Sequence, residues 1–279
     1  MLAQVPFIPF IHSAQDVIFV FYVFLRVTGL FFFSPFFSSK NLPPSLKVIF
    51  TAFVTALMAI PLYPSYRGAN PEYSLLLDGQ AIYLLQIILY SIQELFTGYL
   101  IGLLFSMINE GLMIASQLAS IMMGFSMSKM IDPISGTPQA LLGQLFMITG
   151  TMIVFLLDLH HMPIYVLAKS FSIIPLASAQ TPIEGGDALI QGSARMWHYG
   201  LKYAAIPCVV LFLVTVGLGF MAKIMPEMNI FMIGFPIKIF IGYYSLIACI
   251  KFFPLILRQA YIEYENLSLY FLKLLGNQG

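Results

Sequence analysis

Charged residues are scarce in this 279-residue chain: only 9% of its residues are Asp, Glu, Lys or Arg, and 59% are hydrophobic. Soluble domains carry roughly a quarter charged residues, so the deficit excludes an ordinary soluble domain and predicts a membrane protein. The net charge is +1 and no run of Lys or Arg occurs, so nucleic acid is not expected as a partner.

Cysteines and catalytic motifs are also few. The two cysteines, Cys208 and Cys249, lie in apolar runs without CxxC or histidine spacing, which argues against a disulfide framework or a zinc site. No HExxH, P-loop, GxSxG or dinucleotide-binding motif occurs. Asp158, His160 and His161 have metal-ligating side chains, but adjacent histidines point to different faces of a helix. We therefore predict a protein that is not an enzyme and binds no cofactor or metal.

The chain consists mainly of long apolar segments that proline and glycine interrupt. No polar linker separates soluble modules, which predicts one all-α, multi-helix membrane domain over residues 1–279. The longest run, Ala81 to Ile108, would extend about 42 Å as a helix. It exceeds the ~30 Å hydrocarbon core of a bilayer, so we expect it to tilt, kink or project beyond the membrane.

Local signals predict how two further segments behave. A helix that begins at Leu46 should end near Pro61 and Pro64, because proline breaks the helical hydrogen-bond pattern. The amphipathic tail from Glu263 to Leu275 should be a helix that lies at the membrane interface or binds a partner.

Isolated charges within the apolar segments predict contacts with other polypeptides. Placing Arg at the centre of a lipid-facing helix costs at least about 2.5 kcal/mol, so such charges should face protein or water. We expect neighbouring subunits to satisfy them. The predicted partner-facing charges are Arg26, Glu94, Asp158, Lys238 and Lys251.

Small residues at four-residue spacing predict close helix packing. Residues four apart share one helix face, where small side chains let another backbone approach in lipid. The predicted packing residues are Gly98, Gly102, Gly111, Ala115, Ala119, Ser120 and Gly124.

A methionine-rich segment follows these small residues, and the helical pattern breaks there at Asp132-Pro133. Methionine is flexible and fills irregular gaps, so such a break can seal a space whose shape changes. An ordinary packed helix followed by a turn is the alternative.

Two other function classes also stay open at this point. A secondary transporter would use broken segments and intramembrane charges, and a membrane protease would use His160 or His161 as its base.

The order and spacing of five stretches resemble the FliR family, the flagellar export-gate subunits of type III secretion, whose close relatives are the injectisome SctT proteins. The stretches are Arg26 to Pro44 (RVTGLFFFSPFFSSKNLPP), Gly98 to Gly102, Met123 to Pro133, Phe155 to Pro175, and Met225 to Ile239 (MPEMNIFMIGFPIKI). The resemblance spans nearly the whole chain.

The resemblance implies that one FliR-like chain joins several FliP-like and FliQ-like subunits in a helical hetero-oligomer around an export pore. An FlhB-like subunit and unfolded export substrates would be further partners. The fold would consist of long, kinked helical hairpins. A FliP-like part would cover residues 1–187, and a FliQ-like helical hairpin with the amphipathic tail would cover 188–279. The protein would lie in the bacterial inner membrane and the flagellar basal body, in contact with lipid, with much of the complex above the bilayer plane.

The resemblance also implies that the segment through the Asp-Pro break forms a plug inside the closed pore. The matching plug or gasket residues are Met122, Met123, Met127, Ser128, Lys129, Met130, Ile131, Asp132, Pro133 and Ile134. Lys129 departs from the apolar, aromatic-containing segment that the resemblance predicts. We expect the methionines to close the pore to small solutes, because thioethers adapt to irregular gaps.

Overall fold

The computed structural model describes residues 14–33, 43–68, 81–125, 138–177, 186–225, 227 and 230–276. All regular structure within these residues is helical, which confirms the all-α prediction. The helices are α1 (Ala14–Phe33), α2 (Pro44–Gly68), α3 (Ala81–Met123), α5 (Pro138–Leu156), α6 (His161–Ile173), α7 (Gly186–Ile224), α8 (Ile230–Ile250) and α9 (Phe253–Gly276).

Helix α3 is one uninterrupted helix of 43 residues. At 1.5 Å per residue it extends about 65 Å, roughly twice the hydrocarbon core of a bilayer. It ends at Met123, before the predicted Asp132-Pro133 break. The next residue, Gly124, has a φ of +88°, and its N–H donates to the Ile121 carbonyl oxygen at 3.0 Å. A glycine in the left-handed region is a common helix C-cap, because it has no Cβ to clash.

Helix α2 continues through Pro61 and Pro64 to Gly68, so the prediction that it ends at these prolines was wrong. Its last turns pack against α1. The Tyr63 hydroxyl donates to Asp16 Oδ1 at 3.2 Å, and the Tyr66 ring stacks on Phe19 with centroids 4.5 Å apart. These tertiary contacts offset the local cost of proline within a helix.

Four helices of the described chain are long and apolar enough to cross a membrane: α2, α3, α7 and α8. A fifth span is possible if α5 and α6 together form one broken span. In the most apolar 18-residue stretch of α2, only 17% of the residues are buried within the chain, and the value for α7 is also 17%. The helices therefore keep large apolar surfaces for lipid or for other proteins, in agreement with the predicted membrane protein.

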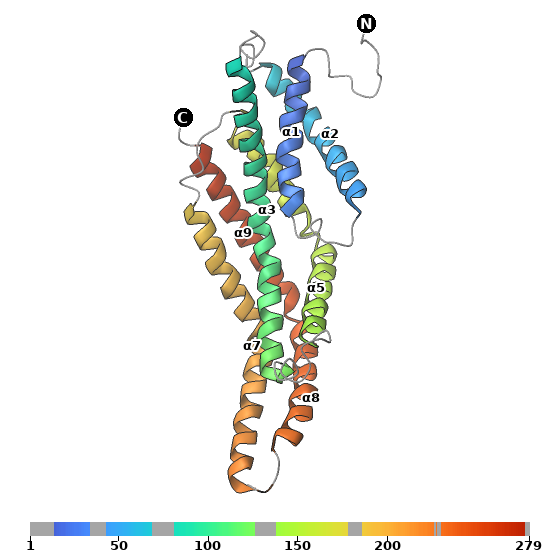
Figure 1. Cartoon of the computed structure of the whole chain (residues 1–279), viewed down its shortest axis with the longest axis vertical. Coiled ribbons are helices and arrows are strands. Elements are labelled where there is room, and N and C mark those ends of the chain that lie inside the picture. Colours follow the sequence, from blue (N-terminus) through green and yellow to red (C-terminus); the bar gives the residue numbers. More distant parts are fainter. Residues whose placement is uncertain are drawn as a thin grey trace. The chain divides into compact units, whose positions relative to one another are not determined.

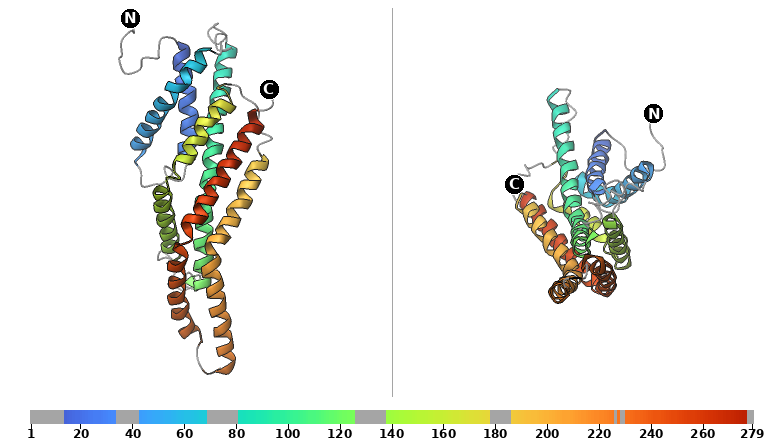
Figure 2. Two further views of the ribbon diagram at one scale, coloured as in Figure 1. Left: turned by 180° about the vertical axis from the view of Figure 1, so that it is seen from behind. Right: turned by 60° about the horizontal axis from the view of Figure 1, so that its bottom comes forward.

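The first of two compact units comprises residues 1–106, 161–189 and 265–279. Within it α1 lies against α2 and contacts α6 (Figures 1 and 2). The last turns of α9 belong to the same unit and bury Leu267, Phe271 and Leu272. A Cβ added at Gly276 would lie 2.7 Å from the Ile173 carbonyl oxygen. The tail predicted to lie at an interface or on a partner therefore packs its apolar face within the chain's own unit, and that prediction was wrong.

The second unit comprises residues 107–160 and 190–264. Helices α7 and α8 form an antiparallel hairpin in it (Figure 1). Its core is rich in tyrosine, and Tyr199, Tyr203, Tyr261 and Tyr264 are buried. The Tyr264 hydroxyl donates to the Gly192 carbonyl oxygen at 2.7 Å, and burial raises the pKa of this tyrosine. The hydroxyl therefore remains a protonated donor over the whole physiological pH range.

Each unit draws on segments that are distant in the sequence. The predicted FliP-like part (1–187) and FliQ-like part (188–279) have other boundaries than these two compact units, because the prediction rests on a resemblance to other subunits. That division stays a prediction.

Candidate functional site

A buried ion pair joins α1 to α3 within the first unit. Arg26 Nε donates to Glu94 Oε2 at 2.6 Å, and the exposed fractions of the two side chains are 1% and 4%. Removing such charges from water costs several kcal/mol for each ion, so a buried pair persists only where further hydrogen bonds compensate. The surroundings of the pair supply those bonds.

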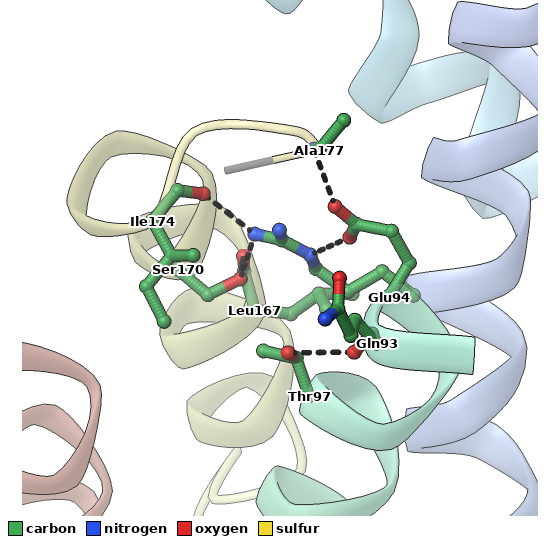
Figure 3. A network of polar contacts seen from close by, with 8 residues as sticks. Gln93, Glu94, Thr97, Leu167, Ser170, Ile174 and Ala177 are labelled. Carbon is green, nitrogen blue, oxygen red and sulfur yellow. Dashed lines mark hydrogen bonds and ion pairs between the residues drawn. The ribbon is translucent and has the colours of Figure 1, made fainter. Parts of the chain in front are cut away.

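The C-terminal end of α6 provides most of the compensation (Figure 3). Arg26 Nη1 donates to Ser170 Oγ at 3.3 Å and to the Ile174 carbonyl oxygen at 3.1 Å. The guanidinium carbon Cζ of Arg26 lies 4.6 Å from the centroid of the Phe171 ring, within cation–π range. Arg26 of α1 therefore contacts Ser170, Phe171 and Ile174 at the end of α6.

Glu94 holds the turn that follows α6. Its Oε1 accepts the backbone N–H of Ala177 at 3.0 Å (Figure 3). The φ of Ala177 is +56°, a left-handed conformation that costs roughly 1–2 kcal/mol for a residue with a Cβ. A hydrogen bond to a charged group contributes about 1.5–3 kcal/mol and can offset this cost. The ion pair therefore holds both ends of this turn, Arg26 at the Ile174 carbonyl oxygen and Glu94 at the Ala177 N–H.

A close backbone crossing between α1 and α3 lies beside the pair. A Cβ added at Gly98 would overlap the Arg26 carbonyl oxygen, and one added at Gly29 would overlap the Leu95 carbonyl oxygen. Only glycine fits at both positions. Sequence reasoning named Gly98, and Gly102, which is also buried, but it missed Gly29. The sequence signal that could have identified Gly29 is its place three residues after Arg26 within an apolar run.

The expectation that Arg26 and Glu94 face partner chains was wrong. Each neutralises the other within the chain, across 68 residues of sequence. The prediction recognised correctly that these charges need protein around them, but a single sequence carries no signal for which segments pair. The other three predicted charges lie differently: Asp158 and Lys251 are exposed and Lys238 is half-buried. No ion pair satisfies them within the described residues.

The turn between α5 and α6 holds Asp158, His160 and His161, whose possible ligand atoms all lie within 4.8 Å of one another. Asp158 has a φ of +54°, so this segment is not helical and the argument from helix faces does not apply to it. By residue type and spacing, a carboxylate and two imidazoles can hold a transition metal ion. The absence of a metal site stays a prediction.

The small residues of α3 in the second unit lie against α7. A Cβ added at Gly111 would lie 3.2 Å from the Met196 carbonyl oxygen, and one at Gly200 would lie 3.1 Å from the Gly111 carbonyl oxygen. Of the other predicted packing residues of α3, three are fully buried: Ala115, Ala119 and Ser120. Two backbones therefore meet at Gly111 and Gly200, and sequence reasoning had named only the first.

The predicted plug begins at the end of α3. Met122 is 36% exposed, whereas Met123 is fully buried. Gly124, the last of the predicted packing residues, caps the helix. The remaining plug residues lie outside the described part of the chain: Met127, Ser128, Lys129, Met130, Ile131, Asp132, Pro133 and Ile134.

Comparison with known sequences identifies the family to which these features belong. Residues 17–263 match the family described as bacterial export proteins, family 1. The chain belongs to this family. Among its relatives is the flagellar biosynthetic protein FliR of Bacillus subtilis, which is 25% identical over 243 residues, or 86% of this chain and 88% of the relative. The resemblance to the FliR family is therefore confirmed.

Two other relatives match this FliR-family chain over a slightly smaller part of its length. The FliR protein of Caulobacter vibrioides is 28% identical over 223 residues, covering 79% of this chain and 83% of the relative. The FliR protein of Escherichia coli is 23% identical over 236 residues, covering 85% and 84%. The family match includes the Arg26–Glu94 pair, the whole of α3 and the α7–α8 hairpin. Membership of this family makes the chain a component of a flagellar export apparatus, and its apolar helices fit an inner-membrane location.

Proposed function

We propose that this chain is a non-enzymatic core subunit of the flagellar type III protein export gate. One copy joins FliP-like and FliQ-like subunits around the pore through which unfolded flagellar proteins leave the cell. An FlhB-like subunit contacts the assembly, which belongs to the basal body and lies partly above the bilayer plane. The family match over residues 17–263 is the observation that carries this proposal.

The outward surface of the α7–α8 hairpin supports a role within an assembly. On α7, Phe220 and Ile224 are 67% and 77% exposed, and on α8 Met232 and Phe240 are 78% and 79% exposed. A surface of this kind needs lipid or an apolar protein partner. Lys238 is half-buried on α8, and a cation within an apolar helix favours a protein partner over lipid alone.

The proposal includes a plug formed by Met127 to Ile134, with Met122 and Met123 at its start. Flexible thioethers close the resting pore to small solutes, and displacement of the segment admits an unfolded chain. Lys129 makes this plug less apolar than a fully hydrophobic segment. Deletion of residues 127–134 should increase solute leak while the assembly remains intact. An intact complex whose leak is unchanged would remove the plug from the proposal.

Mass spectrometry of the gently extracted complex tests the function as a whole. The expected result is one copy of this chain with several FliP-like and FliQ-like subunits. Recovery of this chain as a stable, solute-binding particle without other proteins would contradict the proposal and indicate a secondary transporter.

A further inference from the structure

The turn that follows α5 has a well-defined backbone. The Asp158 N–H donates to the Phe155 carbonyl oxygen at 3.2 Å, and the Leu159 N–H donates to the Val154 carbonyl oxygen at 3.0 Å. These two bonds form a Schellman motif, in which the end of a helix satisfies its last carbonyl groups. Leu159 is only 3% exposed, so its side chain anchors the centre of the turn in the protein.

Asp158 occupies the position of this motif at which glycine is usual. Its φ is +54°, in the left-handed region that a Cβ makes unfavourable. Within the described residues, the only other non-glycine residue with a positive φ is Ala177, which Glu94 holds. Backbone strain of this kind concentrates at functional sites. The turn therefore carries a carboxylate at a point where glycine would suit the backbone better.

Two imidazoles lie beside this carboxylate. The His160 ring lies against Phe155 with centroids 4.9 Å apart, which restricts its orientation, and His161 is the exposed first residue of α6. One possible ligand atom from each of Asp158, His160 and His161 lies within 4.8 Å of the others. Ligand atoms at roughly 2.0–2.2 Å from a tetrahedral ion are about 3.4 Å apart. Small rotations of the exposed Asp158 and His161 side chains are enough to reach that spacing.

We propose that Asp158, His160 and His161 bind a divalent transition-metal ion such as Zn²⁺. This site goes beyond the proposed function and does not depend on it. The sequence-based prediction of no metal assumed that both histidines lie in a helix, whereas His160 lies in the turn and only His161 lies in α6. Without that assumption, the neighbouring imidazoles can share one ion.

The donor set decides the class of metal. Two imidazoles and one carboxylate suit Zn²⁺ and Co²⁺, whereas Ca²⁺ and Mg²⁺ prefer sites built from oxygen ligands alone. Three protein ligands leave the fourth tetrahedral position to water or to another donor. The ion balances the charge of the Asp158 carboxylate and holds the turn in its left-handed form. Binding therefore stabilises the folded chain by mass action.

The test is Zn²⁺ binding to the full chain, extracted with the proteins that accompany it and freed of any affinity tag. Protein stripped by a chelator is titrated with Zn²⁺ in a calorimeter, and bound metal is counted by mass spectrometry. The unsubstituted chain should bind one more Zn²⁺ ion than Asp158→Asn or His161→Ala. Affinity should fall at least about tenfold in both variants, because losing a hydrogen-bond partner of a ligand already costs about 10–100-fold. Asn keeps the shape of Asp and tolerates the same backbone conformation.

His198→Ala is the matched control, because His198 is an exposed histidine of α7 outside the cluster. It should bind Zn²⁺ as the unsubstituted chain does, and excess Mg²⁺ should not displace the ion. Co²⁺ provides a second readout, since a four-coordinate Co²⁺ site gives visible absorption that both ligand variants should lack.

Asp158→Gly separates metal binding from the turn itself. Glycine relieves the left-handed backbone, so this variant should raise the unfolding midpoint of the metal-free chain and still lose the Zn²⁺ ion. No Zn²⁺ uptake by the unsubstituted chain would refute the site. Uptake that either ligand variant leaves unchanged, or that His198→Ala lowers equally, would refute it as well.

Discussion

Removing one member of the Arg26–Glu94 pair should cost about as much stability as removing both, because the remaining charge stays buried without its partner. Glu94→Gln keeps the shape and an acceptor oxygen for the Ala177 N–H, but it leaves the guanidinium of Arg26 buried without a counter-charge. Breaking a buried pair in this way costs about 3–5 kcal/mol, and Arg26→Met should cost a similar amount. An exposed ion pair would give only about 0–1 kcal/mol.

The double variant Arg26→Met, Glu94→Met removes both charges and replaces them with apolar volume. It leaves the Ile174 carbonyl and the Ala177 N–H without their present partners, at about 1–3 kcal/mol for each group. Ser170 retains its bond to the Leu167 carbonyl oxygen at 2.7 Å. The expected cost is therefore about 2–6 kcal/mol, whereas Arg26→Met and Glu94→Met at about 3–5 kcal/mol each sum to about 6–10 kcal/mol. The shortfall of about 4 kcal/mol is the coupling between the two residues.

The assay is SDS-induced unfolding in mixed micelles, followed by far-UV circular dichroism. The cycle consists of the unsubstituted chain, Arg26→Met, Glu94→Met and the double variant, and Glu94→Gln is measured beside it. Lys251→Met is the control, because Lys251 is exposed and forms no ion pair within the described residues. It should change the free energy of unfolding by no more than about 0.5 kcal/mol. Additive single effects, or a Glu94→Gln cost below about 1 kcal/mol, would refute the reasoning from burial.

Two further predictions concern packing and pH, and they join the plug deletion described above. Gly98→Ala forces a methyl group onto the Arg26 carbonyl oxygen and should cost at least about 1–3 kcal/mol of stability. Gly143→Ala is the control and should cost little, because a Cβ at this glycine makes only ordinary contacts. Equal effects of the two variants would contradict the backbone crossing. Because burial raises the pKa of Tyr264 above its ordinary value of 10.0, its contribution to stability is complete below pH 10.0 and is lost as the pH rises toward the folded-state pKa. Unfolding measured from pH 8 to 12 should show this loss, and Tyr264→Phe should weaken the dependence while costing about 1 kcal/mol at neutral pH through its lost hydrogen bond. A Tyr264→Phe profile identical to that of the unsubstituted chain would exclude this role.

The class of the protein and the buried faces of its longest helix follow from the sequence alone. Scarce charge and long apolar segments predict a membrane protein, because every charge in lipid has a large cost. Small residues at four-residue spacing predict the packed face of α3, because that spacing returns to the same side of a helix. The order of motifs predicts the FliR family. These signals are local or compositional, and one sequence contains them in full.

Only the tertiary structure decided which segments meet. Arg26 pairs with Glu94 across 68 residues of sequence, and Gly29 and Gly200 gain their roles from the helices that lie against them. Packing on α1 carries α2 through two prolines that local rules treat as an end. The reason is physical: a buried charge or a bare backbone surface requires a complementary neighbour, but periodicity within one segment does not specify which distant segment supplies it.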